Sequence, residues 1–126
     1  MDKQIQDPLT SLIIGGAIEV HKALGPGLLE SAYEECLAME LSDRGLQVAR
    51  QVPIPVVFKG RRLEVGYRAD IIVNDLVIVE LKAIAEILPV HEAQLLSHLK
   101  LANKKVGLLI NFHVAFLRNG IVRMVL

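Results

Sequence analysis

The stretch LVIVELKA, Leu76 to Ala83, sets the strongest constraint on what this chain can fold into. Its apolar residues are typical of a strand in a protein interior, but Glu80 and Lys82 interrupt them. Burying an unpaired charge costs several kcal/mol. A sequence that keeps two charged residues in such a strand must either pair them closely or use them in a functional site.

The composition is that of a compact domain. The chain has 126 residues, 52% apolar and 22% charged, and we expect one folded domain over residues 1–126. The single cysteine, Cys36, excludes an internal disulfide and fits a reducing, cytoplasmic setting. No apolar run is long enough to cross a bilayer, and the N-terminus lacks the layout of a signal peptide. Fourteen basic residues balance fourteen acidic ones, so little repulsion separates two copies, and we expect a homodimer.

Three segments have the pattern of helices. Asp7 followed by Pro8 is a helix start, and apolar residues recur at helical spacing over residues 8–24. After the breaker GPG at 25–27, a second helix is predicted over about 28–44, ending before Gly45. Pro89 opens a third helix, PVHEAQLLSHLKLAN.

The remaining segments have the pattern of strands. We predict strands over 48–58, where two prolines favour a sheet edge, over 62–73, and over 76–83. An apolar strand, KVGLLINF, follows the third helix, and a final hairpin arm is expected over 115–126, turning near Asn119 and Gly120. The predicted order is ααβββαββ, an α/β fold with a small mixed central sheet flanked by helices.

The strand pattern brings polar residues onto one face. Glu80 and Lys82 are two residues apart and therefore share a side of their strand, and Asp70 lies on the polar face of the preceding strand. If the connection between the two strands has an odd length, Asp70 pairs opposite Glu80 and the two carboxylates sit side by side. A strict two-residue turn would instead place Asp70 opposite Val79.

Two close carboxylates repel each other, and a divalent cation between them stabilises the pair. Such a cation, Mg²⁺ or Mn²⁺, activates water and stabilises charge on a phosphate, and Lys82 is placed to assist. The alternative is a simple ion pair, either Glu80 with Lys82 or Asp70 with Lys82. Residue spacing leaves both interpretations open.

Several motifs together resemble one nuclease family. Asp70 followed by Glu80-Leu81-Lys82 is similar to the PD-(D/E)xK signature of restriction-endonuclease-like nucleases, and GLLESAY, Gly27 to Tyr33, is similar to the GxxExxY pattern of a small family among them. The segments PIPVVFKG, YRADIIV, EAQLLSHLK and VGLLINF also fit that family. The resemblance covers nearly the whole chain and implies a restriction-endonuclease-like fold.

The resemblance also implies roles for individual residues. Asp70 and Glu80 would bind metal, Lys82 would be catalytic, and Glu30 would reach the metal directly or through water. Gln94 corresponds to a catalytic helix glutamine, but His98 stands where a tyrosine is usual, and Ala69 replaces the proline of the signature.

Three further residues are assigned to the substrate: Arg68, Tyr33 and His98. Arg68 shares the face of Asp70 and is the cation placed to approach a scissile phosphate, whereas Tyr33 also suits a half-buried packing role. Other candidate phosphate contacts are two basic groups, Lys59, Arg61 and Arg62 in the first and Lys100, Lys104 and Lys105 in the second. Each basic group is also consistent with an ordinary solvated surface.

Three functions agree with these observations. The first is a Mg²⁺- or Mn²⁺-dependent nuclease acting on DNA or RNA. The second is a non-catalytic nucleic-acid-binding or assembly module that keeps the nuclease fold, which the neutral charge and His98 favour. The third is a phosphoesterase acting on small molecules, because its chemistry is the same.

Overall fold

The computed structural model describes residues 7–126; residues 1–6 of the predicted domain lie outside the described residues. Its elements, in chain order, are α1 (Pro8–Leu24), α2 (Glu30–Asp43), β1 (Val48–Pro53), β2 (Val56–Phe58), β3 (Arg61–Leu63), β4 (Arg68–Val73), β5 (Val77–Lys82), α3 (Pro89–Ala102), β6 (Val106–Asn111), the 3₁₀ helix η2 (Leu117–Gly120) and β7 (Ile121–Val125). Within the described residues 7–126, no helix combines the length and apolar character needed to cross a membrane.

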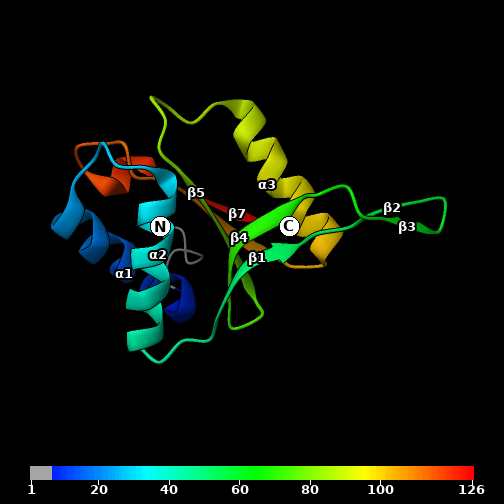
Figure 1. The fold of residues 1–126 in the computed structure, drawn as a ribbon, viewed down its shortest axis with the longest axis horizontal. Coiled ribbons are helices and arrows are strands. Elements are labelled where there is room, and N and C mark those ends of the chain that lie inside the picture. The colour runs from blue at the N-terminus through cyan, green and yellow to red at the C-terminus, as the bar shows by residue number, and fades with distance from the viewer. Residues whose placement is uncertain (1–6) are drawn as a thin grey trace.

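A five-stranded mixed sheet forms the centre of the molecule. Its order is β1-β4-β5-β6-β7, in which β5 and β6 run parallel and the other neighbours are antiparallel. The helices α1 and α2 cover one face of the sheet and α3 covers the other (Figure 1). The predicted α/β fold with a small mixed sheet is therefore confirmed, and it agrees with a restriction-endonuclease-like architecture. The proline-containing strand β1 lies at a sheet edge, as predicted.

Local signals determine where the first helix begins. The Asp7 side chain accepts a hydrogen bond from the backbone N–H of Leu9 at 3.1 Å, and Pro8 occupies the first turn. The buried side of α1 packs on α2 and the sheet, in a core that includes Ile13, Leu37 and Ile71. A smaller core under α3 includes Ile78 and Leu95.

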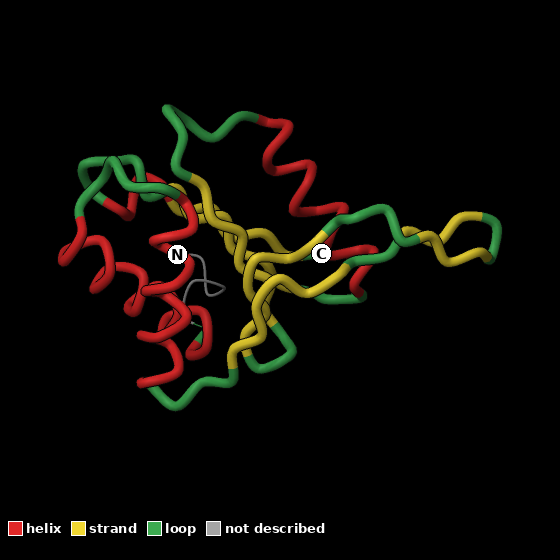
Figure 2. Tube along the Cα trace, viewed as in Figure 1, coloured by secondary structure: helices red, strands yellow, loops and turns green. Residues whose placement is uncertain are grey.

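The predicted number of strands before α3 is wrong. Residues 48–58 form two strands, β1 and β2, and residues 62–73 contain most of β3 and all of β4, so five strands precede α3 instead of three. The breaks fall near Pro55, which has no N–H to donate, and Gly66, which adopts a positive φ of 88°. As a result β2 and β3 form a separate two-stranded hairpin that projects from the body (Figure 2).

The predicted C-terminal hairpin over 115–126 is also wrong. This segment contains η2 and one strand, β7, and β7 pairs antiparallel with β6, as in Ile110↔Ile121. Pairing with β6 hydrogen-bonds the apolar strand on its second side, which a hairpin within 115–126 would leave unpaired.

Candidate active site

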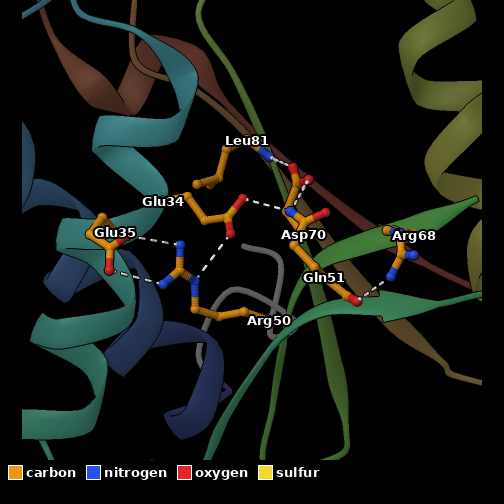
Figure 3. Close-up of polar contacts among 7 residues, drawn as sticks. All are labelled: Glu34, Glu35, Arg50, Gln51, Arg68, Asp70 and Leu81. Atoms are coloured by element: carbon orange, nitrogen blue, oxygen red, sulfur yellow. Dashed lines mark hydrogen bonds and ion pairs between the residues drawn. The ribbon is translucent and has the colours of Figure 1, made fainter.

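The candidate site lies where the ladder between β4 and β5 ends. The pairs Ile71↔Val79, Ile72↔Ile78 and Val73↔Val77 leave a three-residue connection, residues 74–76. The connection therefore has the odd length that the interpretation with two adjacent carboxylates requires, and continuing the same register places Asp70 opposite Glu80. Beyond the last pair, the backbone N–H of Leu81 donates to Asp70 Oδ2 at 2.8 Å (Figure 3). The carboxylate of Asp70 thus continues the ladder at the point where the two strands separate.

Glu80 lies at the end of β5 with its side chain turned toward α3. It is only 6% exposed, and its Oε2 is hydrogen-bonded to Nδ1 of His98. The ring of His98 also lies 5.8 Å from the ring of Tyr67, centroid to centroid. His98, predicted as a substrate contact, therefore holds a carboxylate of the site in this structure.

Neither of the simple ion pairs considered from the sequence forms. Among the ion pairs of residues 7–126, none joins Lys82 to Asp70 or to Glu80. The partner of Glu80 is instead a histidine from another element, at a distance of 18 residues along the chain. Lys82 remains on the wall of the same pocket, where its charge faces the carboxylates.

A polar network that the sequence pattern did not predict connects α2 to Asp70. The amide Nε2 of Gln51 donates to Glu34 Oε1 at 2.9 Å and lies 3.5 Å from Asp70 Oδ1 (Figure 3). Arg50 binds the same helix, through Glu34 at 3.1 Å and Glu35 at 3.0 Å. Gln51 adopts a positive φ of 51°, and no turn motif in the sequence predicts this backbone conformation. The sequence does contain one signal for this network. Glu34 lies four residues after Glu30, and because two acids at that spacing repel each other on a helix, Glu34 is expected to have a polar partner elsewhere.

Two acids that line the pocket, Asp70 and Glu30, have raised pKa values. Burial raises the pKa of Asp70, and the charges of Glu80 and Glu34 raise it further, while the Leu81 N–H and Lys82 lower it. Glu30 stands at the pocket rim, where loss of surrounding water raises the pKa of its carboxyl, followed by the charge of Asp70. Ionised carboxylates are therefore costly in this pocket, first because of burial and then because of mutual repulsion.

These side chains surround a pocket of about 560 Å³ between the sheet, α3 and the start of α2. Seven of the predicted site residues line it: Glu30, Arg68, Asp70, Glu80, Lys82, Gln94 and His98. They come from α2, β4, β5 and α3, so residues that are distant in sequence meet in one place.

The eighth predicted site residue, Tyr33, is not brought to this pocket. Its side chain is fully buried, and its ring stacks on Phe112 with 4.4 Å between centroids. Its hydroxyl donates to the Gly25 carbonyl at 2.6 Å and accepts from the Leu28 N–H at 3.1 Å. Tyr33 therefore fixes the turn between α1 and α2, in line with its alternative packing role.

The donor chemistry of the pocket fits a hard divalent cation held with few protein ligands. Among residues 7–126, no group of three or more His, Cys, Asp or Glu side chains is arranged to hold a metal ion. Asp70 and Glu80 nevertheless supply two neighbouring carboxylates. Burial raises the pKa of Asp70 and the charge of Glu80 raises it further, and a cation relieves repulsion of this kind. Mg²⁺ commonly binds to one or two carboxylates and keeps several waters.

Comparison with known proteins identifies the family. A search of curated proteins and a search of solved structures each found no match to the chain. A family model described as the PD-(D/E)XK nuclease superfamily matches residues 7–124, which include every pocket residue named above and every element except the last residue of β7. The match spans nearly the full length of the chain. The chain belongs to the PD-(D/E)XK nuclease superfamily.

Proposed function

We propose that this protein hydrolyses phosphodiester bonds of nucleic acid, DNA or RNA, with Mg²⁺ or Mn²⁺. The observation that carries the proposal is the meeting of Asp70, Glu80 and Lys82 on one wall of a pocket where the carboxylates repel each other. Family membership supports the nuclease class, since the fold by itself hosts many chemistries.

In this proposal Asp70 and Glu80 hold the cation, and Glu30 supplies a third carboxylate from the pocket rim, directly or through water. When bound, such a cation lowers the pKa of a coordinated water and stabilises negative charge on the phosphate. Lys82 orients the attacking water and neutralises charge on the reacting phosphate. Gln94 on α3 positions the same water or a phosphate oxygen, and Arg68 binds the nucleic-acid backbone beside it.

His98 has a positioning role in this proposal. Because its Nδ1 is bonded to Oε2 of Glu80, the other oxygen of that carboxylate is left for the cation. The histidine thereby fixes the orientation of a buried acid that would otherwise rotate.

The test is cleavage of mixed single- and double-stranded DNA and RNA by the purified protein with Mg²⁺ or Mn²⁺. We expect Asp70→Ala and Lys82→Ala each to lower the rate at least about a hundredfold, since the first removes a carboxylate that would hold the cation and the second removes a positive charge that would stabilise the reacting phosphate. The matched controls are Asp43→Ala and Lys105→Ala, which remove exposed charges of the same type away from the pocket.

Each outcome separates two functions. Equal residual cleavage by all variants would mean a contaminating nuclease. Absence of cleavage, together with a melting temperature that Mg²⁺ leaves unchanged, would favour the non-catalytic nucleic-acid-binding or assembly module. The hydrogen bond between Glu80 and His98 is the observation that supports this second function, because one of the two acids already has a partner within the protein.

We also propose that the protein acts in the cytoplasm as a homodimer. Cys36 is a free cysteine, as expected in a reducing compartment. Zero formal net charge and several large apolar side chains at the surface favour association of two copies.

A further inference from the structure

The hairpin of β2 and β3 is an arm along which no other element of residues 7–126 packs closely. It extends away from the body on the side opposite α1 (Figures 1 and 2). Every residue from Val57 to Arg68 is exposed. An isolated two-stranded hairpin is only marginally stable in water, so an arm of this kind suggests contact with something outside the chain.

The arm is the basic part of an otherwise acidic molecule. We define the basic arm as residues 55–68, which contain Lys59, Arg61, Arg62 and Arg68 against a single acid, Glu64. The whole chain has equal numbers of basic and acidic residues, so the surplus of three positive charges on the arm leaves a surplus of three negative charges elsewhere. Arg62 and Glu64 are 3.7 Å apart and both well exposed, a contact too weak to occupy the arginine.

The cations are distributed over both faces of the ribbon. Val57 pairs with Arg62 and Phe58 pairs with Arg61, and because successive residues of a strand point to opposite faces, the two guanidinium groups do as well. A flat protein surface would meet only one of them. A groove lined by phosphates on both walls meets both.

The shape of the arm selects one kind of nucleic acid. The major groove of B-form DNA is about 12 Å wide and admits a two-stranded β-ribbon. The major groove of A-form RNA is deep and too narrow for side chains to read. Single strands are bound by aromatic stacking platforms, and the exposed aromatic side chains of the arm are only Phe58 and Tyr67.

The root of the arm is part of the pocket. Tyr67 and Arg68 line the pocket, and Arg68 lies two residues before Asp70 on the same strand. The root is fixed by the hydrogen bond from the Ile54 N–H to the Tyr67 carbonyl, at 2.8 Å, and by Arg68 Nη1 donating to the Gln51 carbonyl at 3.2 Å. A nucleic-acid backbone that is bound along the arm therefore extends toward the carboxylates of Asp70 and Glu80 in the pocket.

We propose that the basic arm lies in a groove of double-stranded DNA and holds the duplex beside the pocket. This inference rests on the proposed nuclease function and narrows its substrate to duplex DNA. Arg61 and Arg62 contact phosphates on the two sides of the groove, and Arg68 contacts the backbone where it enters the pocket.

The test measures binding without cleavage. Fluorescence anisotropy in EDTA compares a 24-base-pair DNA duplex with duplex RNA and single-stranded DNA of the same length, at about 50 to 200 mM salt. Arg61→Ala/Arg62→Ala is compared with Lys100→Ala/Lys105→Ala, which removes two exposed lysines from the other basic group. Any repulsion from the pocket acids is common to all these proteins.

We expect the wild type to prefer duplex DNA. The arm variant should bind it about tenfold more weakly, with the slope of log K against log salt reduced by about two, because each lost phosphate contact removes about 0.9. The lysine control should keep the wild-type slope, and all melting temperatures should agree because the mutated side chains are exposed.

An unchanged slope in the arm variant would overturn the proposal, as would a preference for duplex RNA or single strands. So would loss of self-association by the arm variant in sedimentation, which would assign the arm to a second copy of the chain. Arm-dependent binding of duplex DNA without cleavage under Mg²⁺ would instead refute the nuclease and retain the arm.

Discussion

At the scale of single residues, an ionised carboxylate in the site lowers the free energy of unfolding of the protein. The pKa of Asp70 is raised above its ordinary value, chiefly by burial. A raised folded-state pKa means that the folded protein binds the proton more tightly than the unfolded chain does. The contribution of Asp70 to the free energy of unfolding is therefore greatest at pH values below the ordinary carboxyl pKa, and it is lost as the pH rises through the raised value.

Because the pKa of Asp70 is raised, we expect Asp70→Asn to stabilise the metal-free protein at pH values where the aspartate is ionised. Asparagine keeps an oxygen that can accept from the Leu81 N–H but carries no charge. The variant should melt a few degrees above the wild type at pH 8, and the difference should shrink toward pH 4. Thermal denaturation in EDTA across this range measures it. Asp43→Asn, at the exposed end of α2, should follow the wild-type pH dependence. A variant that is less stable than the wild type at pH 8 would contradict the argument.

The residues of the site differ in how far the sequence could identify them. The resemblance to the nuclease family implies the roles of Asp70, Glu80 and Lys82, but their placement on polar strand faces follows from strand alternation, which is a local property. The role of Gln51 does not, because its contact with Glu34 and its 3.5 Å approach to Asp70 Oδ1 occur where its backbone takes a φ of 51°, a conformation chosen by the surrounding structure. The pairing of Glu80 with His98 likewise requires α3 to cross the sheet at one particular place.

At the scale of elements, the contact between α1 and α2 determines where α2 holds its acids. A Cβ added at Gly16 would lie 2.8 Å from Leu41 Cδ2, and Leu41 is fully buried. One at Gly15 would lie 3.1 Å from Nη1 of Arg44, the mobile end of a partly exposed side chain. The two glycines are neighbours in sequence but face environments of different stiffness.

We therefore expect Gly16→Ala and Gly15→Ala to act in opposite directions. Gly16→Ala should lower the free energy of unfolding by about 1–3 kcal/mol, because the helices must separate or Leu41 must leave its rotamer. Gly15→Ala should leave it unchanged or raise it by up to about 1 kcal/mol through helix propensity. Urea denaturation of both variants measures the difference. Equal effects would mean that the close approach at Gly16 is not limiting.

Elements defined by local signals were predictable, and those defined by pairing were not. The start of α1 follows from Asp7 and Pro8, whose effects act within one turn. The arm does not follow from its sequence alone. The pairs Pro53↔Arg68 and Val56↔Leu63 differ in register by two residues. That offset separates the arm from the central sheet, and it is visible only once both strands have partners.

At the scale of the whole molecule, the two ends have different surfaces. The basic arm forms one end, and the turn between α1 and α2 lies beside the segment before η2 at the other (Figure 1). At this second end Leu29 is 77% exposed and Phe116 is 67% exposed. Pro26 and Phe116 line one surface pocket there, with Lys22 and Arg118 also in its lining, so the turn and the segment form one common surface with an apolar part. A symmetric dimer through this surface would leave both arms free for DNA.

The expected outcome is a wild-type dimer in sedimentation equilibrium at tens of micromolar protein. Leu29→Lys/Phe116→Lys should be monomeric, because two-fold symmetry brings four new positive charges into an apolar interface. Met39→Lys places a charge at another exposed apolar position, on α2, and should remain dimeric, as should the arm variant. A monomeric wild type would refute the dimer, whereas a dimer that survives both lysines would move the interface to another surface. Phe116 lies outside the pocket that contains Asp70, so Phe116→Lys alone should keep the affinity for Mg²⁺, which separates assembly from the chemistry of the site.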